Sequence, residues 1–131
     1  MVEGVKIHGA PYHRQRGFLY KANAFGIPDD EIKSKWDTIP DDVDILMTHI
    51  PPYGILDEEE DGHVGCPYLF DAVQRTKPIL HCFGHVHFQR GCATMVGAGQ
   101  KDATVYCNAA TLREEGMHAP VVVDFDFRVV K

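Results

Sequence analysis

Two short apolar segments, residues 43–48 and 78–83, constrain the fold of this chain more than any other feature. Between them, apolar residues recur at the spacing of one helix face: Cys66, Leu69, Phe70 and Val73. A strand, a helix and a second strand in succession favour a parallel pair of strands joined by a crossover connection. The 131 residues fit one domain, so residues 1–131 are predicted to form a single α/β to α+β unit.

The same patterns predict the elements before the first apolar segment. Alternation closed by Pro11 predicts a strand over residues 5–10, and the mixed sequence of residues 11–28 predicts a long loop. A helix is predicted to begin near Pro28 and to end near residues 39–40, with Ile32 and Trp36 on one face.

The tail of the chain predicts three further strands, at residues 92–96, 104–107 and 121–127, connected by hairpins as a meander. On the last of them, Asp124 and Asp126 alternate with apolar residues and are predicted to face solvent. The acidic stretch of residues 57–61 is predicted to be a solvated loop.

Charge and composition exclude several classes of protein. The formal net charge is -6 and Lys and Arg do not cluster, which argues against non-specific nucleic-acid binding and against anionic membranes. No apolar run approaches the roughly 20 residues that span a bilayer. The four cysteines show no paired spacing, so reduced, buried thiols and a cytoplasmic location are expected: Cys66, Cys82, Cys92 and Cys107.

Three histidines stand directly after the two apolar segments. His49 follows the first segment and precedes a double proline, while His85 and His87 follow the second segment with one residue between them. Carboxyl ends of parallel strands are the usual binding edge of such a sheet. In extended backbone, residues two apart lie on the same face, so an H-x-H pair can ligate one metal ion or two neighbouring ions. Each histidine alone is more often a hydrogen-bonded structural residue.

Around these histidines the sequence resembles the calcineurin-like metallophosphoesterases. Residues 48–54 (THIPPYG) and 84–87 (GHVH) are similar to the fourth and fifth motifs of that family. The resemblance extends over the whole chain to the metallophosphoesterase-domain-containing branch, through further segments: residues 7–12, 35–40, 44–54, 64–66 and 106–109.

The resemblance implies a fold and a chemistry. The fold would be the C-terminal half of a four-layer αββα sandwich, with one mixed sheet and flanking helices. His49 and His85 would ligate one metal and His87 the other, the metals being Mn, Fe or Zn. In the complete family fold, a hydroxide bridging two metals hydrolyses a phosphoester or phosphodiester. These three histidines are therefore the predicted metal-ligating and catalytic residues.

The first three motifs of that family, which supply the bridging aspartate and an asparagine ligand, are absent from the sequence. Without an anionic bridge two cations repel each other, so at most one metal is expected here. The leading hypothesis is a partial metallophosphoesterase domain, and the alternative is a non-catalytic module that binds a metal or a partner protein. An H-x-H site on a cupin-type barrel fits poorly, because helices interrupt the strands.

Four other residues have weaker predictions. His81 is expected in the core or behind the ligands, and Asn108 is expected either to hold a site loop or to form a turn. His8 and His13 could reach the site from the first strand and its loop. Because half of a sandwich leaves an apolar sheet face uncovered, self-association into a dimer or larger assembly is expected.

Overall fold

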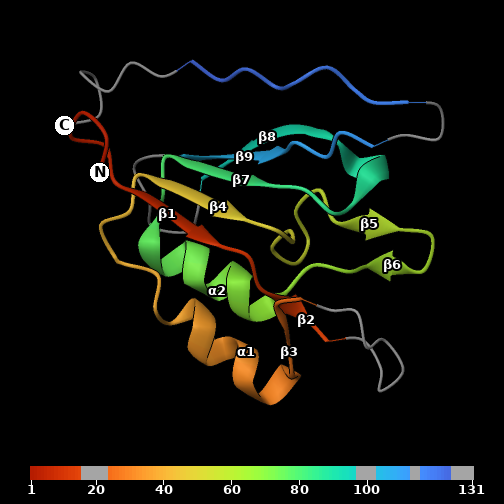
Figure 1. The fold of residues 1–131 in the computed structure, drawn as a ribbon, viewed down its shortest axis with the longest axis horizontal. Helices are drawn as coiled ribbons and strands as arrows, with labels where there is room; N and C mark the ends of the chain where they lie inside the picture. The colour runs from red at the N-terminus through yellow and green to blue at the C-terminus, as the bar shows by residue number, and fades with distance from the viewer. Residues whose placement is uncertain (16–23, 97–102, 113–115, 125–131) are drawn as a thin grey trace.

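The computed structural model describes residues 1–15, 24–96, 103–112 and 116–124. Its centre is a five-stranded mixed sheet, shown in Figure 1. In spatial order the strands are β1 (Ile7–Ala10), β4 (Ile45–Thr48), β7 (Leu80–Phe83), β9 (Thr104–Asn108) and β8 (Gly91–Met95). The first four are parallel to their neighbours, and β8 is antiparallel to β9. The α/β class, the strand–helix–strand succession and the parallel pairing predicted from the sequence are confirmed.

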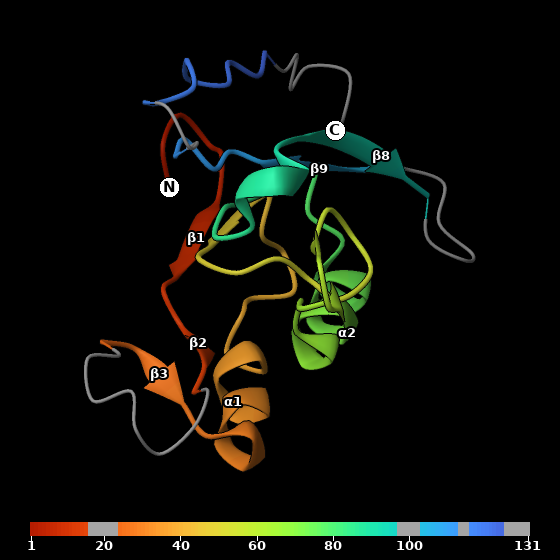
Figure 2. The same cartoon turned by 90° about the vertical axis from the view of Figure 1, so that its right-hand side faces the viewer.

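Both long helices, α1 (Asp29–Trp36) and α2 (Pro67–Thr76), lie on the same side of this sheet (Figures 1 and 2). The predicted apolar face of α1 is confirmed, because Ile32 and Trp36 are fully buried. Helix α2 begins with proline at its first position and ends where Lys77 takes a left-handed conformation. The core fills the space between the helices and the sheet, and it contains Ile32, Trp36, Leu46, Leu69, Val73, Phe83 and Tyr106 among others.

Two small two-stranded sheets lie where the sequence predicted loops. In the segment predicted as a long loop, β2 (His13–Arg14) pairs with β3 (Gly26–Ile27). In the acidic stretch, β5 (Glu58–Glu59) pairs with β6 (Gly62–His63). The prediction of a solvated loop over residues 57–61 is wrong at its first residue, because Asp57 is only 1% exposed.

The meander predicted for the tail is only partly correct. Strands β8 and β9 do form an antiparallel pair, but β9 lies between β7 and β8 and runs parallel to β7. The reason is burial: β9 is mostly buried and takes an interior position, whereas the more exposed β8 takes the edge. Residues 121–124 are not in a strand, and the rest of the predicted strand 121–127 lies outside the described residues.

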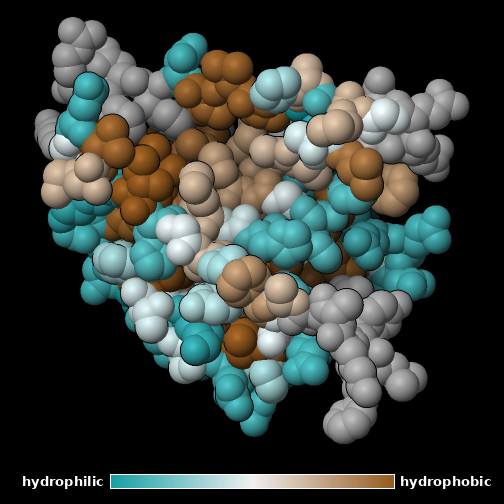
Figure 3. Space-filling view, viewed as in Figure 1, coloured by the Kyte–Doolittle hydropathy of each residue, from teal (hydrophilic) through white to brown (hydrophobic). Residues whose placement is uncertain are grey.

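The sheet face opposite the helices is only partly covered. In both views the segment 116–124 runs on that side of the sheet (Figures 1 and 2). On this face Leu80 and Cys107 are buried, while Ile7 and Met47 are 44% and 49% exposed. Figure 3 shows apolar surface over the side of the molecule where β1 and the N-terminal turn lie. Among the described residues, no helix is long and apolar enough to cross a membrane.

Candidate metal site at the carboxyl edge of the sheet

The predicted site residues lie in loops at one edge of the sheet. His49 directly follows β4, Gly84 and His85 follow β7, and Asn108 is the last residue of β9. These three strands are parallel and in register, so their carboxyl ends meet at the same edge. The backbone N–H of Gly84 donates to the carbonyl of His49 over 3.1 Å and ties the two histidine loops together.

His49 and His85 are brought together. Nε2 of His49 lies 3.1 Å from Nδ1 of His85, and the two ring centroids are 4.9 Å apart. Burial, and then the neighbouring His13, lower the pKa of His49 below its ordinary value. The neutral imidazole is the form that binds metal ions. The fold therefore favours the ligand form of His49.

The H-x-H segment does not have the extended backbone that was predicted for it. His85 has a φ of 71°, and the N–H of Val86 donates to the carbonyl of Gly84 over 2.9 Å. This hydrogen bond closes a three-residue γ-turn around His85, a strained conformation for a residue with a side chain. His87 then begins the short 3-10 helix η1 (His87–Gln89) and is exposed.

His87 is consequently not joined to the other two histidines by any described contact. Within the part of the chain that the structure describes, no three or more His, Cys, Asp or Glu side chains are arranged to hold a metal ion. The structure thus brings together two of the three predicted ligands. The ligand role of all three stays a prediction.

His81 lies in the core behind His49, as one of its two predicted roles requires. The ring is fully buried and its Nε2 lies 2.9 Å from Oγ1 of Thr48. Because the Thr48 hydroxyl donates its proton to the carbonyl of Ile50, Nε2 of His81 must be the donor to Thr48. His81 thereby fixes the side chain next to His49. Burial lowers the pKa of His81 to about 3, so the ring is neutral.

Asn108 performs both of the roles that the sequence left open. Its Nδ2 donates to the carbonyl of Val86 over 2.8 Å, which holds the turn between His85 and His87. The same group donates to the carbonyl of Leu56 over 3.2 Å. Its Oδ1 accepts from the N–H of Ala110, which shapes the turn after β9. Asn108 therefore joins two loops of the site edge to the central sheet.

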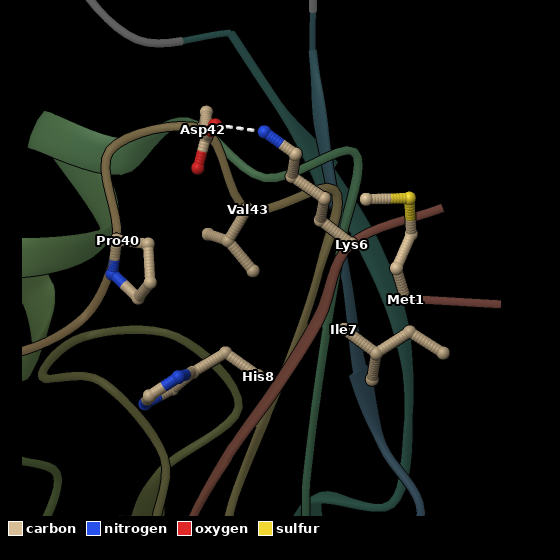
Figure 4. A pocket seen from close by; sticks show the side chains of 7 residues that line it. All are labelled: Met1, Lys6, Ile7, His8, Pro40, Asp42 and Val43. Carbon is tan, nitrogen blue, oxygen red and sulfur yellow. Dashed lines mark hydrogen bonds and ion pairs between the residues drawn. The ribbon is translucent and has the colours of Figure 1, made fainter. Parts of the chain in front are cut away.

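The two weaker histidine candidates have different positions. The His13 ring packs edge-on against His49 at 5.9 Å, but both of its nitrogens lie within 3.2 Å of backbone carbonyls, those of Arg14 and Ala24. These contacts occupy the atoms that would bind a metal. His8 instead lines an open pocket of about 250 Å³ together with Met1, Ile7, Pro40 and Val43, beside the ion pair of Lys6 and Asp42 (Figure 4). His8 is therefore part of another surface.

A buried carboxylate that was not predicted from the sequence, that of Asp57, lies beside the site. Oδ2 of Asp57 accepts from the backbone N–H groups of Gly54 and Gly65, each over 2.9 Å, and its Oδ1 lies 2.7 Å from Nδ1 of His63. The hydrogen bond to Asp57 raises the pKa of His63. The signal that could have revealed this role is the pair of glycines near the aspartate, since glycine allows close backbone approach.

The packing around residue 65 leaves no room for a side chain, so we expect this position to require glycine. A Cβ atom at residue 65 would lie 2.5 Å from the carbonyl oxygen of Pro52 and 2.7 Å from Oδ2 of Asp57. Gly65→Ala is therefore expected to lower the free energy of unfolding by about 2 kcal/mol or more. Urea unfolding would measure it, with Gly62→Ala as the comparison for strain from a positive φ in open space. An unchanged midpoint for Gly65→Ala would show that the loop can shift to admit a methyl group.

Comparison with known proteins finds relatives that match this chain along most of its length. No family model matches the chain. Metallophosphoesterase domain-containing protein 1 of Homo sapiens is 36% identical over 129 residues, which cover 94% of this chain and 36% of the human protein. A UPF0046 protein of Caenorhabditis elegans is also 36% identical over 129 residues, covering 92% of this chain and 42% of its own length.

The chain is thus related over nearly its whole length to proteins named as metallophosphoesterase domain-containing proteins. The chain belongs to the family of the metallophosphoesterase domain-containing proteins, as the resemblance in its motifs predicted. It spans less than half the length of these curated relatives.

Proposed function

We propose that this chain carries the histidine half of a metal-dependent phosphoesterase site, which hydrolyses phosphoester or phosphodiester bonds of small molecules. The observation that supports this most directly is the 3.1 Å approach of Nε2 of His49 to Nδ1 of His85. The relatives named as metallophosphoesterase domain-containing proteins support the same reaction class.

The separation of the two ring nitrogens suits a shared metal ion. Two nitrogens bound to one tetrahedral ion at about 2.0–2.1 Å lie roughly 3.3 Å from each other. A small rotation of either ring would increase the observed separation of 3.1 Å to that value. Imidazole ligands favour Zn, Fe or Mn over Ca or Mg. The residues present therefore fit one divalent transition metal, with His87 as the proposed further ligand.

A metal ion held by His49 and His85 would supply a nucleophile from water at neutral pH and would stabilise negative charge on a phosphoryl group. The chain's own residues hold the ligands in place for this. The Gly84 N–H fixes the His49 backbone, His81 fixes Thr48 beside it, and Asn108 fixes the turn that carries His85. Such supporting contacts are needed because a ligand displaced by a fraction of an ångström binds its metal less tightly.

One observation favours a second candidate function, a non-catalytic module that binds a metal or a partner protein. Within the described ranges, no cluster of three metal-binding side chains is present. Two imidazoles alone leave a metal with too few protein ligands for an efficient hydrolytic site. Activity, rather than metal binding, separates the two candidates.

We propose that the sheet belongs to a four-layer sandwich in the complete domain, that the protein is cytoplasmic, and that copies of this chain associate through the helix-free face. The exposed Ile7 and Met47 support self-association, and they lie on β1 and β4, at the end of that face away from β8. Elution as a monomer at micromolar concentration would contradict it.

The central test is His85→Ala, compared with His118→Ala as a matched histidine variant away from the His49–His85 pair. After loading with Mn and dialysis, the unsubstituted chain is expected to retain metal, and His85→Ala to bind it at least about tenfold more weakly. Hydrolysis of bis-p-nitrophenyl phosphate with added Mn is measured on the same samples. Metal-dependent turnover lost only in His85→Ala supports the enzyme.

Bound metal without turnover would support the non-catalytic module instead. Equal metal content in the unsubstituted chain and in His85→Ala would contradict the enzyme and the metal-binding form of the non-catalytic module, and would leave a module that binds a partner protein. His118→Ala guards against a general effect of removing an imidazole, and far-ultraviolet circular dichroism of each variant verifies that the fold is retained.

A further inference from the structure

Three cysteines form a row across neighbouring strands of the sheet. Cys107 on β9 is directly opposite Cys92 on β8 and directly opposite Cys82 on β7. Residues that are directly opposite each other in a sheet project from the same face. His81, Phe83 and Tyr106 alternate with this row and face the helices, so the three thiols lie on the helix-free face.

Two of these thiols are already in contact. Sγ of Cys92 lies 3.2 Å from Sγ of Cys107, and both residues are free cysteines. Opposed residues of an antiparallel pair have Cα atoms about 4.5–5.5 Å apart, which is within the range that a disulfide bridges. Closing the remaining gap to a bond of about 2.05 Å needs rotation of the side chains and no rearrangement of the strands.

We propose that Cys92 and Cys107 are a site of reversible oxidation by low-molecular-weight disulfides, which leaves a disulfide between β8 and β9. Cys92 is exposed and Cys107 is 1% exposed, so an incoming oxidant reaches Cys92 first. Burial raises the pKa of the Cys107 thiol to about 12, which also makes Cys107 the slower of the two to attack an external disulfide.

The reaction proceeds by two exchanges. The Cys92 thiolate attacks one sulfur of the small disulfide, forms a mixed disulfide and displaces one small thiolate. The Cys107 thiolate then attacks the Cys92 sulfur, forms the Cys92–Cys107 bond and displaces the second small thiolate. The two cysteine protons pass through solvent to the two released thiolates. Two electrons move from the protein thiols to the small disulfide, which is reduced to two thiols.

The bond would join the edge strand to the interior of the sheet. Strand β8 hydrogen-bonds only to β9 within the five-stranded sheet. Cys107 directly precedes Asn108, which holds the turn carrying His85. The oxidised pair would therefore stiffen the strand that supports the candidate metal site.

The other two cysteines serve as controls. The Cys66 sulfur is fully buried and accepts from Nε1 of Trp36 over 3.3 Å, so an oxidant does not reach it. Cys82 is the alternative partner for Cys107, because it lies in register on the opposite side. The 3.2 Å contact between the two sulfur atoms favours Cys92, and the experiment distinguishes the two pairings.

The experiment treats the full chain with oxidised glutathione and counts thiols after denaturation with Ellman's reagent. The count is expected to fall from four to two and to return to four with dithiothreitol. Trypsin separates the three thiols of the row into residues 76–90, 91–101 and 102–113. Mass spectrometry without reductant is expected to find residues 91–101 linked to 102–113.

Three cysteine variants test whether the disulfide joins Cys92 to Cys107. Cys82→Ser is expected to retain the link, while Cys107→Ser is expected to stop at one glutathione on Cys92. In Cys92→Ser, loss of the Cys107 thiol is expected to be at least about tenfold slower, since the intramolecular exchange is gone. A constant count of four, a link to residues 76–90, or disulfide-linked dimers would overturn the proposal. None of these outcomes depends on metal binding or hydrolysis.

Discussion

Asp57→Ala is expected to lower the free energy of unfolding by about 3 kcal/mol, a large effect for one residue of an acidic stretch. The carboxylate accepts from two backbone N–H groups and bonds to His63, and the N–H of Gly65 is buried. Alanine leaves that donor without a partner, and an unpaired buried donor costs about 1–3 kcal/mol by itself. Urea unfolding at pH 7 measures the loss.

Asp61→Ala is the matched control, because Asp61 belongs to the same acidic stretch and is exposed. Its effect is expected to stay within about 0.5 kcal/mol. A second readout comes from nuclear magnetic resonance: in Asp57→Ala the pKa of His63 should move down, toward the ordinary histidine value, because its hydrogen-bond partner is gone. Equal stabilities for the two variants would show that the Asp57 contacts contribute little.

Acid is expected to destabilise the protein by about 2 kcal/mol between pH 7 and pH 5 through His81 alone. In the unfolded chain a histidine takes up a proton near pH 6.5, whereas burial keeps the pKa of folded His81 at about 3. Between these values the unfolded state binds one more proton. The contribution of His81 to the free energy of unfolding is thus fully present above about pH 6.5 and is lost as the pH falls below that value.

The structure gives the reason for this neutral ring. Protonated His81 would carry a second N–H at Nδ1, an atom that is buried and has no hydrogen-bond partner among the described residues. His81→Gln retains an N–H donor for Thr48 and does not titrate. Its unfolding free energy, measured in urea at pH 7 and pH 5, should therefore fall by about 2 kcal/mol less than that of the unsubstituted chain. Equal falls would refute the assignment to His81.

The pKa values of two other histidines also differ from the ordinary value, and the direction of each shift fixes how that histidine changes the stability with pH. The pKa of His49 is lowered, so His49 also loses its contribution as the pH falls. The pKa of His63 is raised, so its contribution is present at low pH and is lost as the pH rises through the folded pKa. Both effects are present in the unsubstituted chain and in His81→Gln, and the difference between them isolates His81.

The local pattern of the chain determined the main elements. The apolar runs before His49 and Gly84 form β4 and β7, and the helical spacing of Ile32 and Trp36 forms the buried face of α1. These elements follow from the sequence because hydrophobic periodicity is a local property. The sequence also placed His49 and His85 directly beyond these two runs, and the parallel pairing of β4 with β7 then brought the two loops to the same edge of the sheet.

Only the tertiary structure decided the features that depend on contacts distant along the chain. Burial of Asp57 requires Gly65 and the loop after His49 to close around it, and nothing in a run of acidic residues indicates this. The place of β9 inside the sheet depends on which strand can be buried on both faces. The γ-turn at His85, which directs one histidine to His49 while His87 enters η1, depends on the contact of Asn108 with Val86. The sequence by itself determined which residues could ligate a metal, and the packing of distant loops decided which of them meet.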